Sequence, residues 1–71
     1  MVLADFLKTM RANDKVNITL IDSDDNILIT FNCKGYEAVE SDIQKRTVNK
    51  IKVDTEKLLL VYIEDAPLPS V

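Results

Sequence analysis

The sequence predicts an α+β fold in which an N-terminal helix packs on a twisted four-stranded antiparallel sheet made of two β-hairpins. Three observations indicate this: a helical apolar stripe opens the chain, two alternating stretches flank a short polar turn, and residues 58–63 are apolar at every position. A strand with no polar face belongs inside a sheet, so we expect the final strand to be interior. A small, strongly curved barrel is the alternative architecture.

The first predicted element is a helix over residues 2–12. Apolar residues recur there at intervals of three and four, which places them on one helical stripe: Leu3, Phe6, Leu7 and Met10. Only two residues precede this stripe and neither has a capping side chain, so we expect the helix start to fray.

A β-hairpin follows the helix. Residues 15–21 alternate between apolar and polar, and residues 27–33 alternate again, with Cys33 in phase with the apolar face. Asp, Ser and Asn fill the segment between them, residues 22–26, as is typical of a turn. Two alternating runs around such a turn predict a hairpin.

The second half of the chain is expected to form another hairpin. Residues 36–46 form either an irregular connection or a helical turn or two, which would face inward through Tyr36, Val39 and Ile43. Whether this segment covers the second face of the sheet stays open. The third strand is residues 47–53, with a bulge or a late start near Val48 because that residue is out of phase. Residues 1–66 then form a single domain, and residues 67–71 form a flexible, proline-containing tail.

Size limits how this protein is stabilised. The chain has 71 residues, and a domain of that length buries only about 60% of the surface that its unfolded chain exposes. A single cysteine, Cys33, allows no internal disulfide, and the absence of histidine leaves no Cys/His zinc site. Stability must come from the apolar core, and self-association would add to it.

Charge and apolar runs restrict the partners and the compartment. The net charge is -3, so a nucleic acid is a disfavoured partner, because phosphate backbones are bound by basic surfaces. No apolar run approaches the roughly 20 residues that span a bilayer, and the first residues lack the pattern of a secretion signal. An unpaired cysteine suits a reducing compartment, so we expect a cytoplasmic protein away from membranes.

The sequence offers no residue set that supports catalysis. Residues 22–26 open like a calcium loop, but Ile27 and Cys33 stand where such a loop needs glycine and glutamate, so a solvated turn is predicted. Cys33 has no histidine to activate it and shares the phase of a core face. We therefore predict that the protein is not an enzyme and has no metal, cofactor or small-molecule substrate.

Two surfaces are candidates for binding. One is a second apolar face of the sheet, whose predicted members are Ile21, Leu28, Leu59, Val61 and Ile63. The other is the one concentration of basic residues, which consists of Lys45, Arg46, Lys50 and Lys52. Acidic residues lie close to this basic patch. They favour the interpretation that the patch is a solvated mixed-charge face, which prevents edge pairing, and disfavour a nucleic-acid site.

The chain opens with Leu-Ala-Asp-Phe-Leu, continues with Lys-Val-Asn-Ile and a polar Asp-Asp-Asn turn, and closes on the apolar strand over residues 57–64. This layout resembles small uncharacterised proteins encoded by bacteriophages and mobile elements of Gram-positive bacteria. The resemblance implies an accessory protein of a mobile element and transfers no functional residue.

The function that these observations favour is a non-catalytic protein-interaction module that self-associates, so that its partner is a second copy or another protein. One alternative is an inhibitor or mimic that binds a host nucleic-acid-handling complex. The other is a weak nucleic-acid-binding domain that uses the basic patch.

Overall fold

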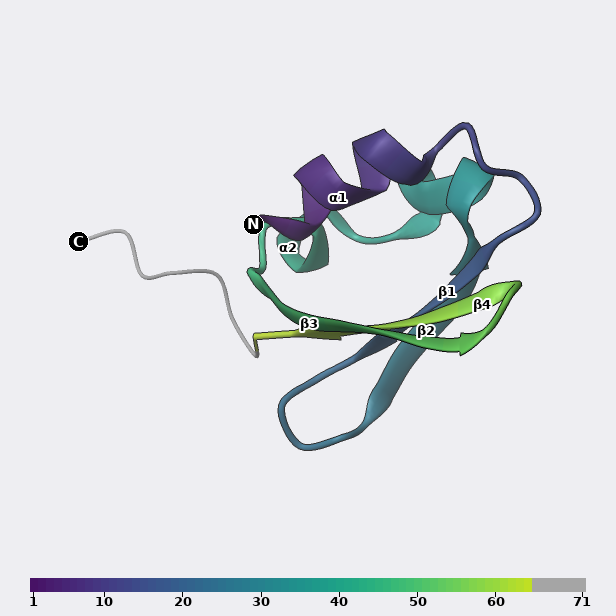
Figure 1. Ribbon diagram of the computed structural model, residues 1–71. Helices are drawn as coiled ribbons and strands as arrows, with labels where there is room; N and C mark the ends of the chain where they lie inside the picture. Colours follow the sequence, from purple (N-terminus) through teal and green to yellow (C-terminus); the bar gives the residue numbers. More distant parts are fainter. Residues whose placement is uncertain (65–71) are drawn as a thin grey trace.

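Helices cover one face of a four-stranded sheet (Figure 1). The computed structural model describes residues 1–64, and the predicted tail, 67–71, lies outside the described residues. The elements in chain order are α1 (Leu3–Met10), β1 (Asn17–Ile21), β2 (Ile27–Asn32), the 3-10 helix η1 (Cys33–Ala38), α2 (Ser41–Gln44), β3 (Val48–Thr55) and β4 (Leu58–Ile63). The α+β class and the N-terminal helix are confirmed.

The start of α1 is held by the backbone of a distant segment. No side chain in the described part of the chain caps the helix, as predicted. The backbone N–H of Leu3 donates to the carbonyl of Arg46 at 2.8 Å, and the N–H of Val48 donates to the carbonyl of Met1 at 2.8 Å. These bonds tie the helix start to the residues that lead into β3, so the structure anchors a terminus that was expected to fray.

The strand order is β2-β1-β4-β3, which places β4 between β1 and β3. The predicted interior position of the all-apolar strand is therefore confirmed. β1 with β2, and β3 with β4, form the two expected antiparallel hairpins. β1 and β4 run parallel, so the sheet is mixed, and the prediction of a purely antiparallel sheet is wrong. Within residues 1–64 the sheet ends at β2 and β3, so it is open and not a barrel.

The parallel pairing of β1 with β4 requires a long connection between the two hairpins. β2 and β3 each run antiparallel to a central strand, and the two central strands run the same way, so β2 and β3 also share a direction. A chain that joins two such strands must cross from one end of the sheet to the other, which takes a dozen or more residues. Residues 33–47 make this crossing, with η1 near the end of β2 and α2 near the N-terminus (Figure 1).

The core lies between the helical layer and one face of the sheet. Its buried members are Leu3, Phe6, Leu7, Ile18, Leu20, Phe31, Cys33, Val39, Val61 and Ile63. Tyr36 and Ile43 pack against this cluster, so the predicted inward-facing residues of the crossover are confirmed. The crossover thus covers the same face as α1, and the described residues leave the second face without a helix on it.

Candidate functional site

The face of the sheet opposite the helices is the candidate functional surface, and we call it the open face. Its members follow from strand pairing, because residues paired across two strands share a face. Thr19 pairs with Leu60 and Ile21 pairs with Tyr62, and neither Thr19 nor Ile21 belongs to the core cluster. Extending these pairs across β2 and β3 gives most central members of the open face: Thr19, Ile21, Ile27, Thr30, Lys50, Lys52, Leu58, Leu60 and Tyr62. Leu28 joins them because it alternates with Thr30, and the register shift beside Ile21 brings the neighbouring Ile27 to the same face.

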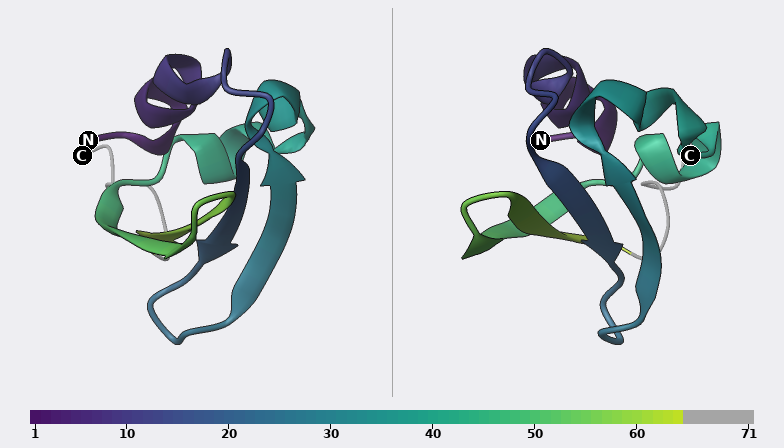
Figure 2. Two further views of the ribbon diagram at one scale, coloured as in Figure 1. Left: turned by 45° about the vertical axis from the view of Figure 1, so that its right-hand side comes forward. Right: turned by 90° about the vertical axis from the view of Figure 1, so that its right-hand side faces the viewer.

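The middle of the open face is well packed although no helix within residues 1–64 covers it. Thr19 is 5% exposed and Ile21 is 7% exposed. The Thr19 and Thr30 hydroxyls form a cross-strand hydrogen bond of 2.9 Å, which satisfies these polar groups. Figure 2 shows the β1–β2 hairpin crossing the β3–β4 hairpin steeply, so the open face lies in the angle between the two hairpins. The strong twist of the sheet lets neighbouring side chains shield Thr19 and Ile21 of β1 from water.

The outer part of the open face is apolar and reachable. Ile27, which pairs with Ile21, is 69% exposed, and Leu28 is also exposed. On β4, Leu60 and Tyr62 are only half-buried. Burying apolar area stabilises a contact by roughly 25 cal/mol per Å². Covering this surface with another chain therefore lowers the free energy.

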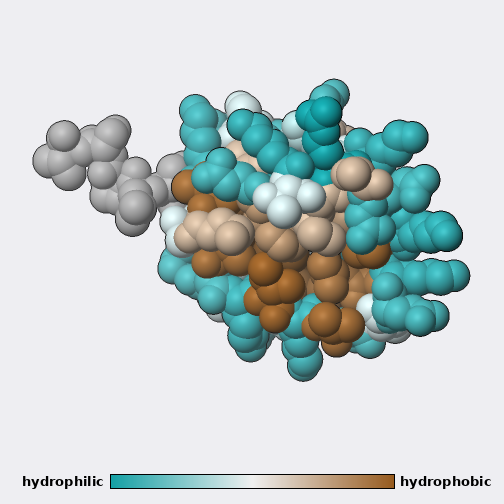
Figure 3. Space-filling view, turned by 45° about the horizontal axis from the view of Figure 1, so that its top comes forward, coloured by the Kyte–Doolittle hydropathy of each residue, from teal (hydrophilic) through white to brown (hydrophobic). Residues whose placement is uncertain are grey.

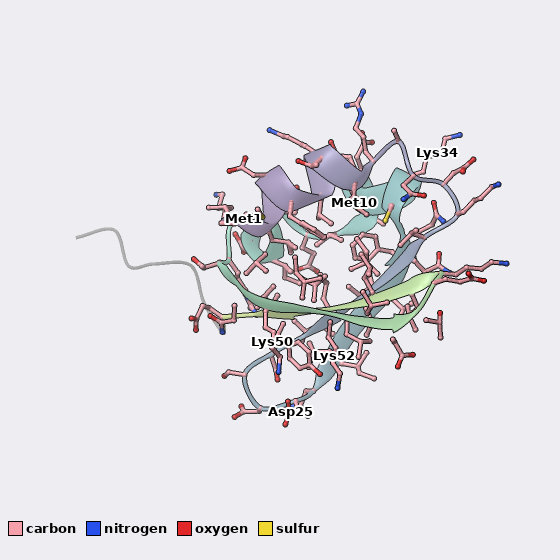
Figure 4. The ribbon with its side chains drawn as sticks, in the orientation of Figure 1. Met1, Met10, Asp25, Lys34, Lys50 and Lys52 are labelled. Carbon is pink, nitrogen blue, oxygen red and sulfur yellow. The ribbon has the colours of Figure 1, made fainter. Side chains whose placement is uncertain are left out.

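Two lysines on the edge strand β3 border the open face. Figure 4 shows Lys50 and Lys52 on the same side of the sheet, below β3 in that view. The Lys50 ammonium lies 4.7 Å from the centroid of the Tyr62 ring, a cation–π contact worth about 0.5–1 kcal/mol at an exposed site. Within residues 1–64, neither ammonium group makes an ion pair with a carboxylate of its own chain.

An acidic turn borders the same face from the other hairpin. The Asp22 carboxylate accepts the backbone N–H groups of Asp24 and Asn26, each at 2.9 Å, and Asp25 adopts a left-handed φ of 65°. The loop therefore closes on its own backbone, which confirms the predicted turn. Among the described residues, no group of three or more potential ligands is placed to hold a metal ion. The Asp24 and Asp25 side chains are exposed at the tip.

The predicted apolar site residues divide between the two faces. Ile21 and Leu28 lie on the open face, as expected. Val61 and Ile63 are 0% exposed in the core beneath the helices, and Leu59 packs against that core. These three are therefore corrected from surface to interior, and the alternate residues of β4 take their place on the open face. An unbroken apolar run contains no signal of which half faces the helices, which is why sequence reasoning missed Leu60 and Tyr62.

The predicted basic patch is spread over two elements. Lys45 and Arg46 lie in the connection between α2 and β3, where the Arg46 carbonyl accepts the Leu3 N–H. Lys50 and Lys52 lie on β3 and face the open side of the sheet. The Arg46 Nε is buried and has no hydrogen-bond partner in the part of the chain described. Only the two lysines of β3 thus belong to the candidate surface.

Cys33 is a core residue, as its phase predicted. Its side chain is 0% exposed, and it stands at the start of η1, just after β2. Burial raises the pKa of the Cys33 thiol above its ordinary value of 9.0, although the backbone hydrogen bond acts in the opposite direction. A thiol with a raised pKa is protonated at neutral pH, and only the thiolate is a good nucleophile.

A second apolar area lies on the helical side, along β3. Ile51 is 42% exposed and Val53 is 68% exposed, and both pair with β4 residues that face the core. Figure 3 shows apolar surface gathered beside the polar side chains of the helical layer. Register shifts flank the regular part of β3, between Val48 and Lys50 and again after Val53, so the bulge expected near Val48 is confirmed. Bulges and lysines are typical protections of an edge strand.

In comparisons with known proteins, the chain matches no protein-family model, no curated protein and no solved structure. In the described part of the chain, no helix is long and apolar enough to cross a membrane.

Proposed function

We propose that this chain is a non-catalytic protein-interaction module that docks through its open face. One observation carries the proposal: a whole face of the sheet, with Leu60, Tyr62, Leu28 and Ile27 on it, has no covering layer within residues 1–64. Sheets in small domains bury an apolar face against another layer, because a face left in water forfeits the free energy of burial. A partner chain supplies the missing layer.

The chemistry of the reactive groups agrees with a module that binds without catalysing. The only thiol, Cys33, is buried with a raised pKa, and the sequence contains no histidine to serve as a base. No described carboxylate is placed with others as a metal site. The setting we propose is the cytoplasm of a bacterium that carries a phage or mobile element, in line with the resemblance of the layout.

Photo-crosslinking tests this function directly. A photoreactive amino acid replaces Ile27, which is 69% exposed and lies on the open face. The matched control places the same residue at Ala12, which is exposed next to α1 on the helical side. Both variants are expressed in the native host at equal levels, irradiated and analysed by mass spectrometry of the adducts.

We expect defined adducts from position 27 and few or none from position 12. The adducts from position 27 should disappear when Tyr62→Lys is added, because a second charge beside Lys50 disfavours an apolar contact. Equal labelling from both positions, or none from either in a folded chain, would refute docking through the open face. Circular dichroism of each purified variant shows whether it is folded.

A further inference from the structure

We propose that the partner on the open face is a second copy of this chain, held so that Lys50 and Lys52 of each copy meet Asp24 and Asp25 of the other. The inference rests on the proposed function, since it names the occupant of the same surface. Two charged groups of opposite sign border one apolar face, and both are available to another chain. A surface with this pattern is complementary to itself.

The charges on the two sides are free to pair with a partner. The Lys50 ammonium contacts the Tyr62 ring, and Lys52 makes no ion pair within the described part of the chain. On the acidic turn, Asp22 uses its carboxylate within the loop, whereas the exposed carboxylates of Asp24 and Asp25 do not cap the turn. Figure 4 shows Asp25 and the two lysines on the side of the sheet away from the helices.

Twofold symmetry converts this pattern into matched contacts. Consider a twofold axis that lies in the interface and crosses the line between the two charged groups at its midpoint and at a right angle. Such an axis places each charged group opposite the other group of the second copy. The β1–β2 hairpin carries the acidic tip and the β3–β4 hairpin carries the lysines, and the two hairpins cross steeply (Figure 2). Each copy's first hairpin then lies against the second hairpin of its partner, and all four charged contacts are attractive.

Charge also argues against other occupants of this face. A nucleic acid or an anionic membrane would meet the Lys50 and Lys52 side, but the Asp24 and Asp25 tip borders the same face and repels phosphate. A second copy satisfies both signs at once. The apolar residues between them, Leu60, Tyr62 and Leu28, become the dry centre of the contact, and the charges form its rim.

Charge-reversal variants of the full chain test the pairing. One variant carries Lys50→Glu with Lys52→Glu, and the other carries Asp24→Lys with Asp25→Lys. Analytical ultracentrifugation over a wide concentration range gives the dimer dissociation constant at low and at high salt. We expect a wild-type dimer and a dissociation constant raised by more than about tenfold in each variant, because every rim contact becomes repulsive.

Mixing the two variants gives the decisive result. In the mixed pair, the introduced glutamates face the introduced lysines on one side, and the native aspartates face the native lysines on the other. We therefore expect a heterodimer close to wild-type affinity, and its affinity should fall as salt rises. The matched control is Lys8→Glu with Arg11→Glu, an equal change of charge on exposed residues of the helical side, which should leave the dissociation constant unchanged.

Failure of this inference is distinct from failure of the proposed function. A wild-type chain that is monomeric at every concentration, or variants that do not recover on mixing, overturns self-pairing. Adducts from position 27 with a different protein, and none with the chain itself, would leave the docking face intact but assign it to another partner. A loss of fold in any variant is seen by circular dichroism, and the single changes Lys52→Glu and Asp25→Lys then repeat the mixing test.

Discussion

Replacing Phe6 with alanine tests whether the packing of α1 on the sheet holds this fold together. Phe6 lies in the middle of the helix, is 9% exposed and belongs to the buried core cluster. Truncating a buried phenylalanine removes its transfer free energy and leaves a cavity, which together cost about 3–5 kcal/mol.

That loss is large for a chain of this size. Stabilities of about 0.05–0.15 kcal/mol per residue give a total of about 4–11 kcal/mol for 71 residues. A domain of 60–100 residues loses roughly 4–8 °C of melting temperature for each kcal/mol. Phe6→Ala should therefore lower the melting temperature by at least about 12 °C, or leave the chain unfolded at room temperature.

Thermal melting followed by circular dichroism measures the effect, with Thr9→Ala as the control on the same helix. Thr9 is exposed, and its hydroxyl donates only to the Asp5 carbonyl within the helix, so its replacement should change stability by about 0.5 kcal/mol or less. If Phe6→Ala melts within a few degrees of the wild type, then α1 does not contribute to the core as described.

Three further predictions follow from buried and hydrogen-bonded groups. The Cys33 thiol should react with a disulfide reagent only after denaturant unfolds the chain, because it is fully buried. Burial keeps the pKa of the folded Cys33 thiol above the ordinary 9.0, so the unfolded chain loses this proton first. The contribution of Cys33 to the free energy of unfolding should therefore be constant below about pH 9 and fall above it, and Cys33→Ala should weaken that fall in urea titrations at several pH values. Asn32→Ala should cost about 1–2 kcal/mol in the same titrations, because the Asn32 amide donates to the Asp14 carbonyl at 2.9 Å and its oxygen accepts the Lys34 N–H at 3.0 Å. Unchanged midpoints would show that these bonds are exchanged for water at no cost.

Local pattern was enough to predict α1, the four strands and much of the core, but it left the form of residues 36–46 open. The helical stripe that includes Phe6, the alternation in the first hairpin and the phase of Cys33 all depend on which side chains leave water together, and this information lies within a few residues. The interior position of β4 was also readable, because a strand that is apolar on both faces gains most when strands flank it on both sides.

The candidate site was only half predictable. Ile21 and Leu28 were placed on the open face because polar neighbours fixed their phase, whereas β4 offers no polar residue to distinguish Leu60 from Val61. Their faces depend on pairing with β1, which is distant in sequence. The meeting of Lys50 with Tyr62 likewise depends on register across β3 and β4, and no local pattern encodes it.

The sequence by itself determined the apolar content, the order of elements, the single cysteine and the lack of histidine, since these depend on composition and on short-range periodicity. Only the tertiary structure decided that β1 and β4 run parallel, that the chain start is tied to residues 46–48, and that residues 1–64 leave one sheet face uncovered. The physical reason is that a crossover can pass over either face and either end of a sheet. The crossover lies on the same face as α1 because there both bury their apolar side chains in one core.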